Sequence, residues 1–188
     1  MLPPYTEPLI ERARRGDDDA VTELWRALNP PLLRYLRGRI GWGADDVAAE
    51  TWLDATRRLN EFRGTDDDFR RWLFTIARRR LVDELRRRQR RPETAWPDGS
   101  EPVHIDADID QLDDLGRALQ VVRRLPDDQA DAVLLRVVGD FGHVEVAAVM
   151  GRTEGSVRVL VHRGLRRLQT ILQEGVTNED TTAMYREQ

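Results

Sequence analysis

Apolar residues recur every three or four positions along most of the chain, which is the spacing of an amphipathic α-helix. The clearest case is the segment 69–91, where Leu73, Ala77, Leu81 and Leu85 fall on one side of a helix. Runs in which apolar and polar residues alternate, as in a half-buried β-strand, are nearly absent. The pattern therefore predicts an all-α protein.

Two groups of helical segments are separated by a stretch that lacks helical periodicity. Residues 93–114 combine proline and glycine with eight acidic residues and no arginine, and they predict a flexible acidic linker. The predicted architecture is therefore two small helical domains, an N-terminal helical bundle over 1–92 and a C-terminal helix-turn-helix domain over 115–175. Residues 176–188 are polar and are expected to form a tail or a short final helix.

Helix starts and stops are marked clearly in the first group. Gly16 is expected to end one helix, and the three aspartates at 17–19 are expected to cap the next and to match its dipole. Trp25 and Leu28 then belong to a predicted buried face. The Asn29-Pro30-Pro31 segment predicts a break or a bend, because proline lacks the amide hydrogen that a helix interior needs.

The other side of the 69–91 helix is basic. Charged helix faces are usually only solvated, and arginines four residues from Asp83 or Glu84 form ordinary ion-pair ladders. However, ten arginines lie between positions 70 and 91, so most of this positive charge is predicted to be unpaired. A basic stripe about 30 Å long, at about 1.5 Å per residue, favours contact with nucleic acid.

An acidic helix is predicted just before the basic one, beginning at Ala44. Asp45, Asp46, Glu50 and Asp54 share its outer face. Solvation and matching of the helix dipole explain such residues equally well. An acidic helix beside a basic helix suggests two partners, one of them a protein and the other a nucleic acid.

The segment between these two helices, residues 61–68, predicts a turn. Thr65 or a following aspartate is expected to cap the next helix. Phe62 has two open interpretations: its ring could stack on an unpaired base, or it could anchor the turn in the core.

Residues 143–168 predict a helix-turn-helix. Ala147, Gly151 and Val157 have the required spacing, with a small residue where the helices touch, glycine at the turn and an aliphatic residue in the core. Such a motif can be purely structural, but here the second helix is expected to expose a basic face that reads DNA. That face is predicted to carry Ser156, Arg158, His162, Arg163 and Arg166.

The 188-residue chain has a formal net charge of −4, which does not by itself suggest DNA binding. The acidic linker accounts for this sum, and it could compete with DNA for the basic surfaces. The chain has no cysteine and only three scattered histidines, so neither a metal nor another cofactor is expected. No apolar run approaches a membrane span or a signal peptide in length, so a cytoplasmic protein without membrane insertion is expected.

Four stretches in this order resemble an extracytoplasmic-function (ECF) sigma factor, the two-domain minimal form of the bacterial sigma-70 family. They are A-R-R-G-D-D-D-A-V-T-E-L-W, D-D-V-A-A-E-T-W-L, F-R-G-T-D-D-D-F-R-R-W-L-F-T-I-A-R-R-R-L-V-D-E-L-R-R-R and V-E-V-A-A-V-M-G-R-T-E-G-S-V-R-V-L-V-H-R-G-L-R-R-L. The resemblance spans about 9–91 and 115–172. It implies promoter recognition and initiation together with core RNA polymerase, without catalysis by this chain.

The resemblance also implies which residues make the contacts. Docking on the clamp helices of the polymerase β′ subunit would use Asp45, Asp46, Glu50 and Thr51. Recognition and opening of the −10 element would use Phe62, Arg63, Gly64, Arg71, Arg78, Arg79, Arg86, Arg87 and Arg90. Recognition of the −35 element would use Arg152, Ser156, Arg158, Val159, His162, Arg163 and Arg166. Further implied partners are the polymerase β flap and an anti-sigma factor.

The chain departs from the usual family pattern at three places. Ala49 stands where glutamine is usual, Arg79 where asparagine is frequent, and Val159 and Leu160 where polar residues are common. The alternative interpretation is a dimeric helix-turn-helix regulator that acts without being a polymerase subunit, although no heptad seam supports it. A nuclease that holds a metal through the aspartate clusters is a third class, but capping explains those aspartates.

Overall fold

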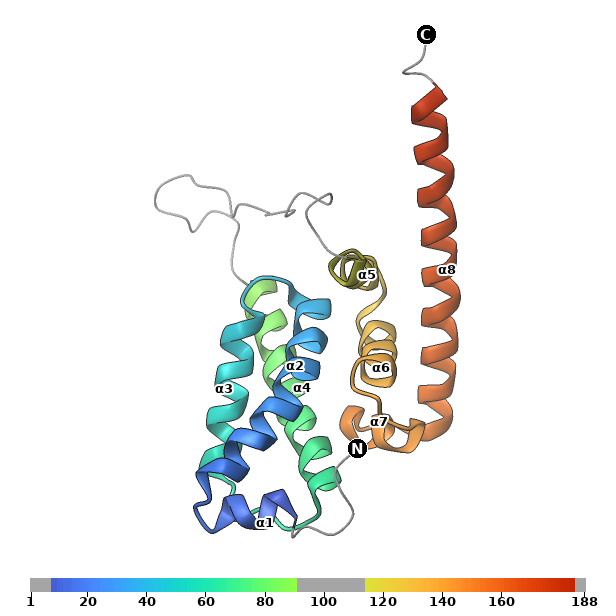
Figure 1. The fold of residues 1–188 in the computed structure, drawn as a ribbon. Helices are drawn as coiled ribbons and strands as arrows, with labels where there is room; N and C mark the ends of the chain where they lie inside the picture. The colour runs from blue at the N-terminus through green and yellow to red at the C-terminus, as the bar shows by residue number, and fades with distance from the viewer. Residues whose placement is uncertain (1–7, 91–113, 185–188) are drawn as a thin grey trace.

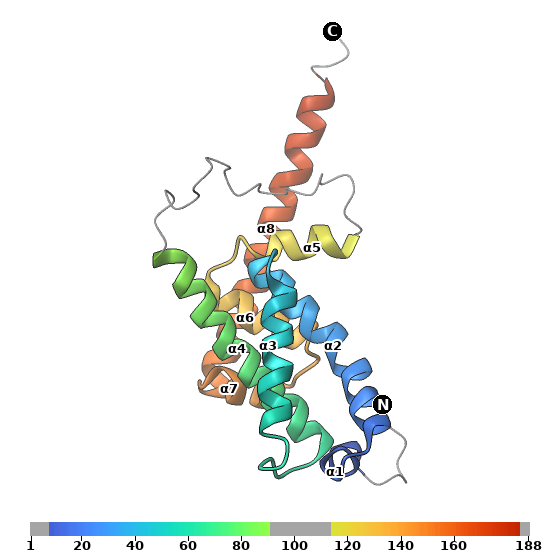
Figure 2. The same ribbon diagram turned by 90° about the vertical axis from the view of Figure 1, so that its left-hand side faces the viewer.

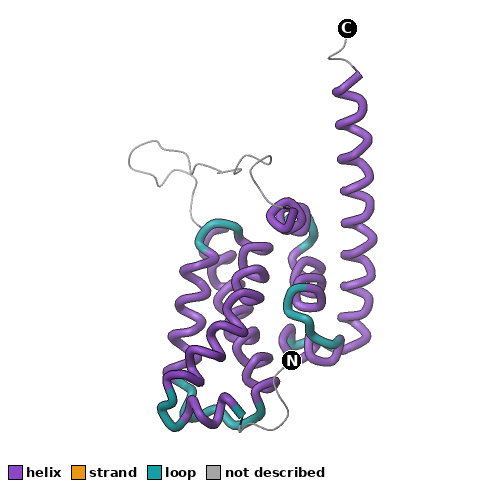
Figure 3. Tube along the Cα trace, in the orientation of Figure 1, coloured by secondary structure: helices purple, strands orange, loops and turns teal. Residues whose placement is uncertain are grey.

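The computed structural model describes residues 8–90 and 114–184, which form eight α-helices and no strand (Figures 1 and 3). The prediction of an all-α protein is confirmed. The helices are α1 Leu9–Arg14, α2 Asp18–Ile40, α3 Ala44–Arg57, α4 Asp66–Arg90, α5 Asp114–Val122, α6 Asp127–Val137, α7 His143–Met150 and α8 Glu154–Met184. The predicted linker lies outside the described residues, except for Asp114, which begins α5.

Helices α1 to α4 form a first module, in which α2, α3 and α4 pack side by side and α1 crosses one end (Figures 1 and 2). The core contains fully buried side chains of α2 and α4, among them Leu32, Leu36, Leu73 and Leu81. The apolar side of the 69–91 segment is therefore the core side of α4, as its periodicity predicts.

The start of α2 follows the predicted capping. The carboxylate of Asp17 accepts hydrogen bonds from the amides of Asp19 and Ala20, at 3.0 and 3.1 Å. The bond from the Ala20 amide, together with Arg12, holds the pKa of Asp17 below its usual value. This cap satisfies amide groups that have no partner inside the helix.

The predicted break at residues 29–31 is absent, since α2 continues through Pro30 and Pro31 to Ile40. Packing on both sides supports the helix where proline removes a hydrogen bond. The Asn29 side chain accepts a hydrogen bond of 3.0 Å from the indole of Trp52, and Leu28 and Leu32 are buried. The expectation of a buried Trp25 is wrong, because its side chain is 49% exposed.

Helices α5 to α8 form a second module. In Figures 1 and 2, α6 and α7 lie between the first module and α8, while α5 crosses the end near α2. The backbone of α8 continues through Gly175 to Met184, where the sequence suggests a tail or a short final helix. No proline interrupts this segment, and its final turns extend beyond the other helices (Figure 1).

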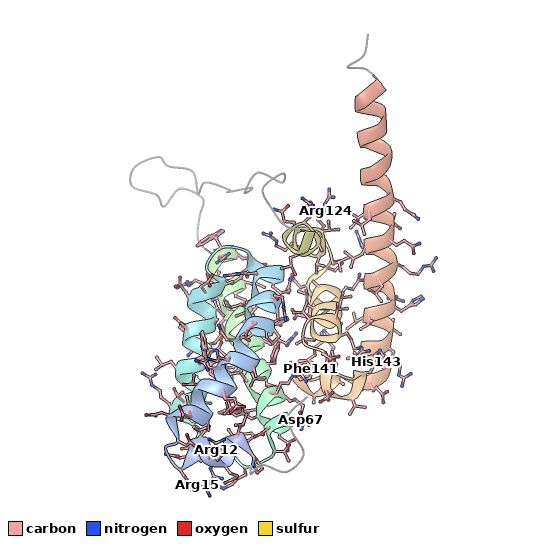
Figure 4. The ribbon with its side chains drawn as sticks, in the orientation of Figure 1. Arg12, Arg15, Asp67, Arg124, Phe141 and His143 are labelled. Atoms are coloured by element: carbon pink, nitrogen blue, oxygen red, sulfur yellow. The ribbon has the colours of Figure 1, made fainter. Side chains whose placement is uncertain are left out.

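The two modules pack directly against each other. Helix α4 contacts α7, and α2 contacts α5 and α6. Phe141, labelled in Figure 4 in the turn before α7, meets Phe74 of α4 edge to face with ring centroids 5.0 Å apart. Gly38 of α2 allows the close approach, since a Cβ atom there would lie 2.9 Å from Leu134 of α6.

A buried ionic cluster crosses this interface. The carboxylate of Asp131 in α6 accepts hydrogen bonds from Tyr35 at 3.2 Å, Arg39 at 2.6 Å and Arg78 at 3.0 Å. Asp131 is only 2% exposed, and Arg39 also binds Asp127 at 2.9 Å. Burial, with the Asp131 charge beside it, raises the pKa of Tyr35 well above its usual value. Burial opposes the charge of Arg39, but Asp131 and Asp127 raise its pKa overall.

Asp66, at the start of α4, caps a different helix. Its carboxylate accepts hydrogen bonds from the amides of Leu9 and Ile10, at 3.0 and 2.8 Å, where α1 begins after Pro8. We expect Asp66→Ala to lower the free energy of unfolding by about 1 kcal/mol, the usual cost of a lost cap. Urea denaturation measures this change, with the exposed Asp67→Ala as the control. Equal stability of the two variants would contradict the assigned role.

Candidate polymerase and nucleic-acid interfaces

The outer face of α3 carries the predicted polymerase-binding acids. Asp45 and Asp46 are exposed in its first turn, and Glu50 is exposed one turn later. Arg37 pairs with Asp45 at 3.0 Å, and Arg80 pairs with Glu50. Asp46 forms no ion pair within the described part of the chain. This face is therefore acidic but partly neutralised by arginines of α2 and α4.

Thr51 does not belong to this face, which corrects the prediction for it. Its side chain is fully buried, and its hydroxyl donates a 2.7 Å hydrogen bond to the carbonyl of Val47. Ala49 and Leu53 point outward instead, and Leu53 is 49% exposed. Sequence reasoning missed Leu53, although its position three residues after Glu50 already places it on the acidic side of the helix.

Phe62 lies in an aromatic cluster at one end of α4. Its ring is half-buried, 5.5 Å from Phe69 in an edge-on arrangement and 5.1 Å from Trp72. Trp52 of α3 extends the cluster at 6.5 Å from Phe69. Phe62 therefore packs partly against the core, and its role as a base-stacking residue stays a prediction.

The rest of the 62–68 loop is held by a reciprocal cap. The Thr65 amide donates to the Asp68 carboxylate at 2.9 Å, and the Asp68 amide donates to the Thr65 hydroxyl at 3.2 Å. The Thr65 amide, and then the Thr65 hydroxyl, which donates to the same carboxylate at 2.9 Å, hold the pKa of Asp68 below its usual value. A Cβ atom on Gly64 would lie only 2.8 Å from Asp68, so glycine fits here best. Arg63 is exposed and donates to the Asn60 carbonyl at 2.7 Å.

The prediction that most arginines of α4 are unpaired is wrong. Some of the partners lie on α4 itself, as the ion-pair ladders predict, but others come from other helices, which the sequence of α4 does not reveal. Arg80 binds Asp54 of α3 at 2.5 Å as well as Glu50. Across the interface, Arg78 binds Asp131, while Arg71 lies 3.7 Å from Glu145 of α7. Arg71 and Arg78 are thus partly covered by the second module.

Four predicted −10 arginines remain exposed on α4: Arg79, Arg86, Arg87 and Arg90. Arg87 pairs with Glu84 at 2.5 Å, and Arg86 lies 3.8 Å from Asp83. Arg79 and Arg90 form no ion pair with another described residue. Arg79 and Arg86 border a hollow of about 560 Å³ whose opposite wall is α7. These exposed cations are the part of the basic stripe that is available to a phosphate chain.

The predicted helix-turn-helix is present in α7 and α8. Gly151 adopts a φ of 63°, which other residues rarely adopt. The Arg152 amide donates a 2.9 Å hydrogen bond to the Ala147 carbonyl, and this bond closes the turn. The Ser156 amide donates to the Thr153 hydroxyl at 3.3 Å, which places half-buried Ser156 in the first turn of α8. Val157 is fully buried, as its spacing predicts.

The predicted −35 residues other than Ser156 fall into two groups. Arg152 and Arg158 are exposed but paired, with Asp128 and Glu154 respectively. Val159, His162, Arg163 and Arg166 are exposed on α8. Leu160 is different, because it is half-buried against the core. The outer face of α8 is therefore cationic, with the apolar side chain of Val159 exposed among the basic residues.

A shallow hollow of about 420 Å³ lies beside this face, between α8 and the start of α6. Its lining residues are Gln129, His162, Arg163, Arg166 and Arg167. Sequence reasoning missed Arg167, which is exposed one position after Arg166. Gly164 permits the close packing of α8 on α6, since a Cβ atom there would lie 2.7 Å from Val133.

Within residues 8–90 and 114–184, no three side chains of histidine, cysteine, aspartate or glutamate are grouped as metal ligands. None of the helices in the same ranges combines the length and the apolar character that crossing a membrane requires.

Sequence comparison matches both modules to known families. Residues 24–91 match "Sigma-70 region 2", and residues 115–168 match "Sigma-70, region 4". The chain is 33% identical over 172 residues to the ECF RNA polymerase sigma factor BldN of Streptomyces coelicolor, covering 88% of this chain and 65% of BldN. It is 31% identical over 175 residues to the ECF RNA polymerase sigma factor SigD of Mycobacterium tuberculosis, covering 87% of this chain and 82% of SigD.

Solved structures show the same fold. The sigma factor RpoE of Bartonella quintana, in a complex with the anti-sigma factor NepR, has a TM-score of 0.66 at 25% identity, covering 83% of this chain and 98% of that one. CnrH, in a complex with the cytosolic domain of CnrY, has a TM-score of 0.65 at 22% identity, covering 88% of this chain and 96% of that one. With both regions present in order, the chain belongs to the sigma-70 family as an ECF RNA polymerase sigma factor.

Proposed function

We propose that this protein directs core RNA polymerase to specific promoters in the cytoplasm and initiates transcription there without enzymatic activity of its own. The observation that carries the proposal is the exposed cationic face of α8, on a helix-turn-helix that follows a region 2 module. The names of the relatives, as ECF RNA polymerase sigma factors, support the same activity. No coiled-coil seam favours the alternative of a dimeric regulator that acts without polymerase.

The first module would bind the polymerase through α3 and the −10 element through α4. Asp45, Asp46 and Glu50, joined by Leu53, offer an acidic surface with an apolar centre for the β′ clamp helices. Opening the −10 element costs a few kcal/mol for each extruded base. Base stacking and phosphate contacts must offset that cost, and exposed Arg79 is the clearest candidate for such a contact.

The second module would place α8 in the major groove of the −35 element. Arg163 and Arg166 would contact phosphates or the acceptor edges of guanine, and Val159 would meet a thymine methyl group. The adjacent Arg167 extends this basic surface toward α6. Phosphate contacts of this kind fix the position of the helix, while base contacts select the sequence.

Arg71 and Arg78 are predicted DNA contacts that are partly blocked in this arrangement, because acidic residues of α7 and α6 form ion pairs with them. Their contact with DNA would require the two modules to separate. Binding of an anti-sigma factor is proposed because the similar RpoE was solved with its anti-sigma factor NepR. Core polymerase would then compete with that regulator for the same chain.

Reconstitution with core RNA polymerase tests the proposal directly. The purified protein is added to core polymerase and a promoter-enriched DNA library, and the transcript starts are sequenced. We expect starts that depend on this protein and that share a −10 and a −35 sequence. Equal starts with and without the protein would sink the proposal, and a dimer that protects duplex promoters without polymerase would favour the alternative.

A further inference from the structure

Trp42 is an unusually exposed aromatic residue in the turn between α2 and α3. Its side chain is 66% exposed, although large aromatic rings are normally buried because they remove much apolar surface from water. Gly41 and Gly43 flank it with φ values of 64° and 78°, so the backbone turns sharply on both sides of the ring. The turn therefore presents the indole on the outside of the first module.

Arg88 of α4 holds this tryptophan in place. Its guanidinium lies 3.9 Å from the centre of the Trp42 ring, at the distance of a cation–π contact. The same group donates to the carbonyls of Ile40 at 3.2 Å and Trp42 at 2.9 Å. Glu84 fixes Arg88 in turn through a 2.8 Å hydrogen bond. The ring is thus fixed in the free protein, which reduces the entropy lost when a partner binds it.

The ring borders a hollow of about 260 Å³ between the start of α3 and the end of α4. Trp42 shares this hollow with Asp46 and Glu50, two of the acids that the proposed function assigns to the polymerase. Asp46 forms no ion pair with another described residue, so the hollow offers a free carboxylate beside an apolar ring. Arg80, Arg87 and Arg88 also line the hollow, but each is paired with a carboxylate. A protein surface with basic and apolar side chains therefore fits this site better than a phosphate does.

We propose that Trp42 is an anchor of the polymerase-binding surface, and that it inserts into an apolar site flanked by basic residues on the core polymerase. This inference rests on the proposed function and extends its docking surface from the acidic face of α3 onto the turn before it. Tryptophan is among the residues that most often dominate protein interfaces, especially when it is held rigidly. The Arg88 contact provides that rigidity here.

The test measures the dissociation constant between fluorescently labelled full-length protein and core polymerase. Trp42→Ala is expected to raise this constant about tenfold or more, the usual effect of losing a dominant aromatic contact. Trp42→Phe is expected to retain most of the affinity. Val144→Ala removes an equally exposed apolar side chain from α7 and is the matched control. Urea denaturation of every variant verifies that the fold is retained.

The outcomes separate this inference from the proposed function. If the wild-type protein binds core polymerase and directs specific transcripts while Trp42→Ala binds equally well, the anchor role is overturned and the proposed function stands. If Trp42→Ala leaves core binding unchanged but weakens promoter binding by the assembled holoenzyme, the ring contacts DNA and the inference is overturned as well. If the wild-type protein itself fails to bind core polymerase, the proposed function is contradicted, and the anchor role is contradicted with it.

Discussion

Asp131→Ala is expected to lower the free energy of unfolding by about 3–5 kcal/mol, because it removes the buried carboxylate that pairs with both Arg39 and Arg78. The side chains of Asp131 and Arg39 are each only 3% exposed, and Tyr35 and Arg78 bind the same carboxylate. Water cannot replace the lost bonds where the site stays closed. Urea denaturation followed by circular dichroism measures the change.

Asp127→Ala is the matched control for this experiment. Asp127 binds the same guanidinium of Arg39, but its side chain is 70% exposed, so its loss should cost less than about 1 kcal/mol. An Asp131→Ala variant as stable as Asp127→Ala would contradict the structural role assigned to the cluster. A double variant with Arg39→Ala should lose less than the sum of the two single losses, since the two residues act together.

Arg163→Ala combined with Arg166→Ala is expected to weaken promoter binding by the reconstituted holoenzyme about 10- to 100-fold. Each arginine that contacts a base edge or phosphate contributes at most about 1–3 kcal/mol to the binding free energy. Each phosphate contact makes the plot of log affinity against log salt concentration steeper by about one. The slope of log affinity against log salt concentration should therefore fall by about two. Fluorescence anisotropy over a series of salt concentrations measures both quantities.

Arg26→Ala removes an exposed arginine from α2, a helix that carries none of the proposed DNA contacts, and is the control for nonspecific loss of charge. It should leave the affinity and the salt slope within about twofold of the wild-type values. If the α8 double variant behaved like Arg26→Ala, α8 would not be the −35 contact. Binding of the double variant to core polymerase should be unchanged, which separates a DNA defect from a docking defect.

The positions of the helices were largely readable from the sequence because they depend on local chemistry. Capping by Asp17 follows from the three aspartates after Gly16, and the turn at Gly151 follows from the spacing of the helix-turn-helix. The exposed arginines of α8 follow from the same 3.6-residue period that buries Val157. Each of these properties depends on residues within about two helical turns of one another.

Two of the expectations that failed concern short stretches of helices that were otherwise predicted correctly. Thr51 is a polar residue on the predicted docking helix, but its angular position around that helix points its side chain into the core. The Pro30-Pro31 pair predicts a break, yet packing of Leu28 and Leu32 and the bond from Trp52 to Asn29 support a continuous α2. Local propensity is weak beside such tertiary contacts.

The all-α class, the acidic helix, the basic helix and the helix-turn-helix, in the order of an ECF sigma factor, could be predicted from the sequence alone. Which of the arginines are free depends on the tertiary structure. Arg78 meets Asp131, and Arg80 meets Asp54, across distances in sequence that no helical period connects. An ion pair depends on separation in space, so the charge of a helix face is known only when its neighbours are in place.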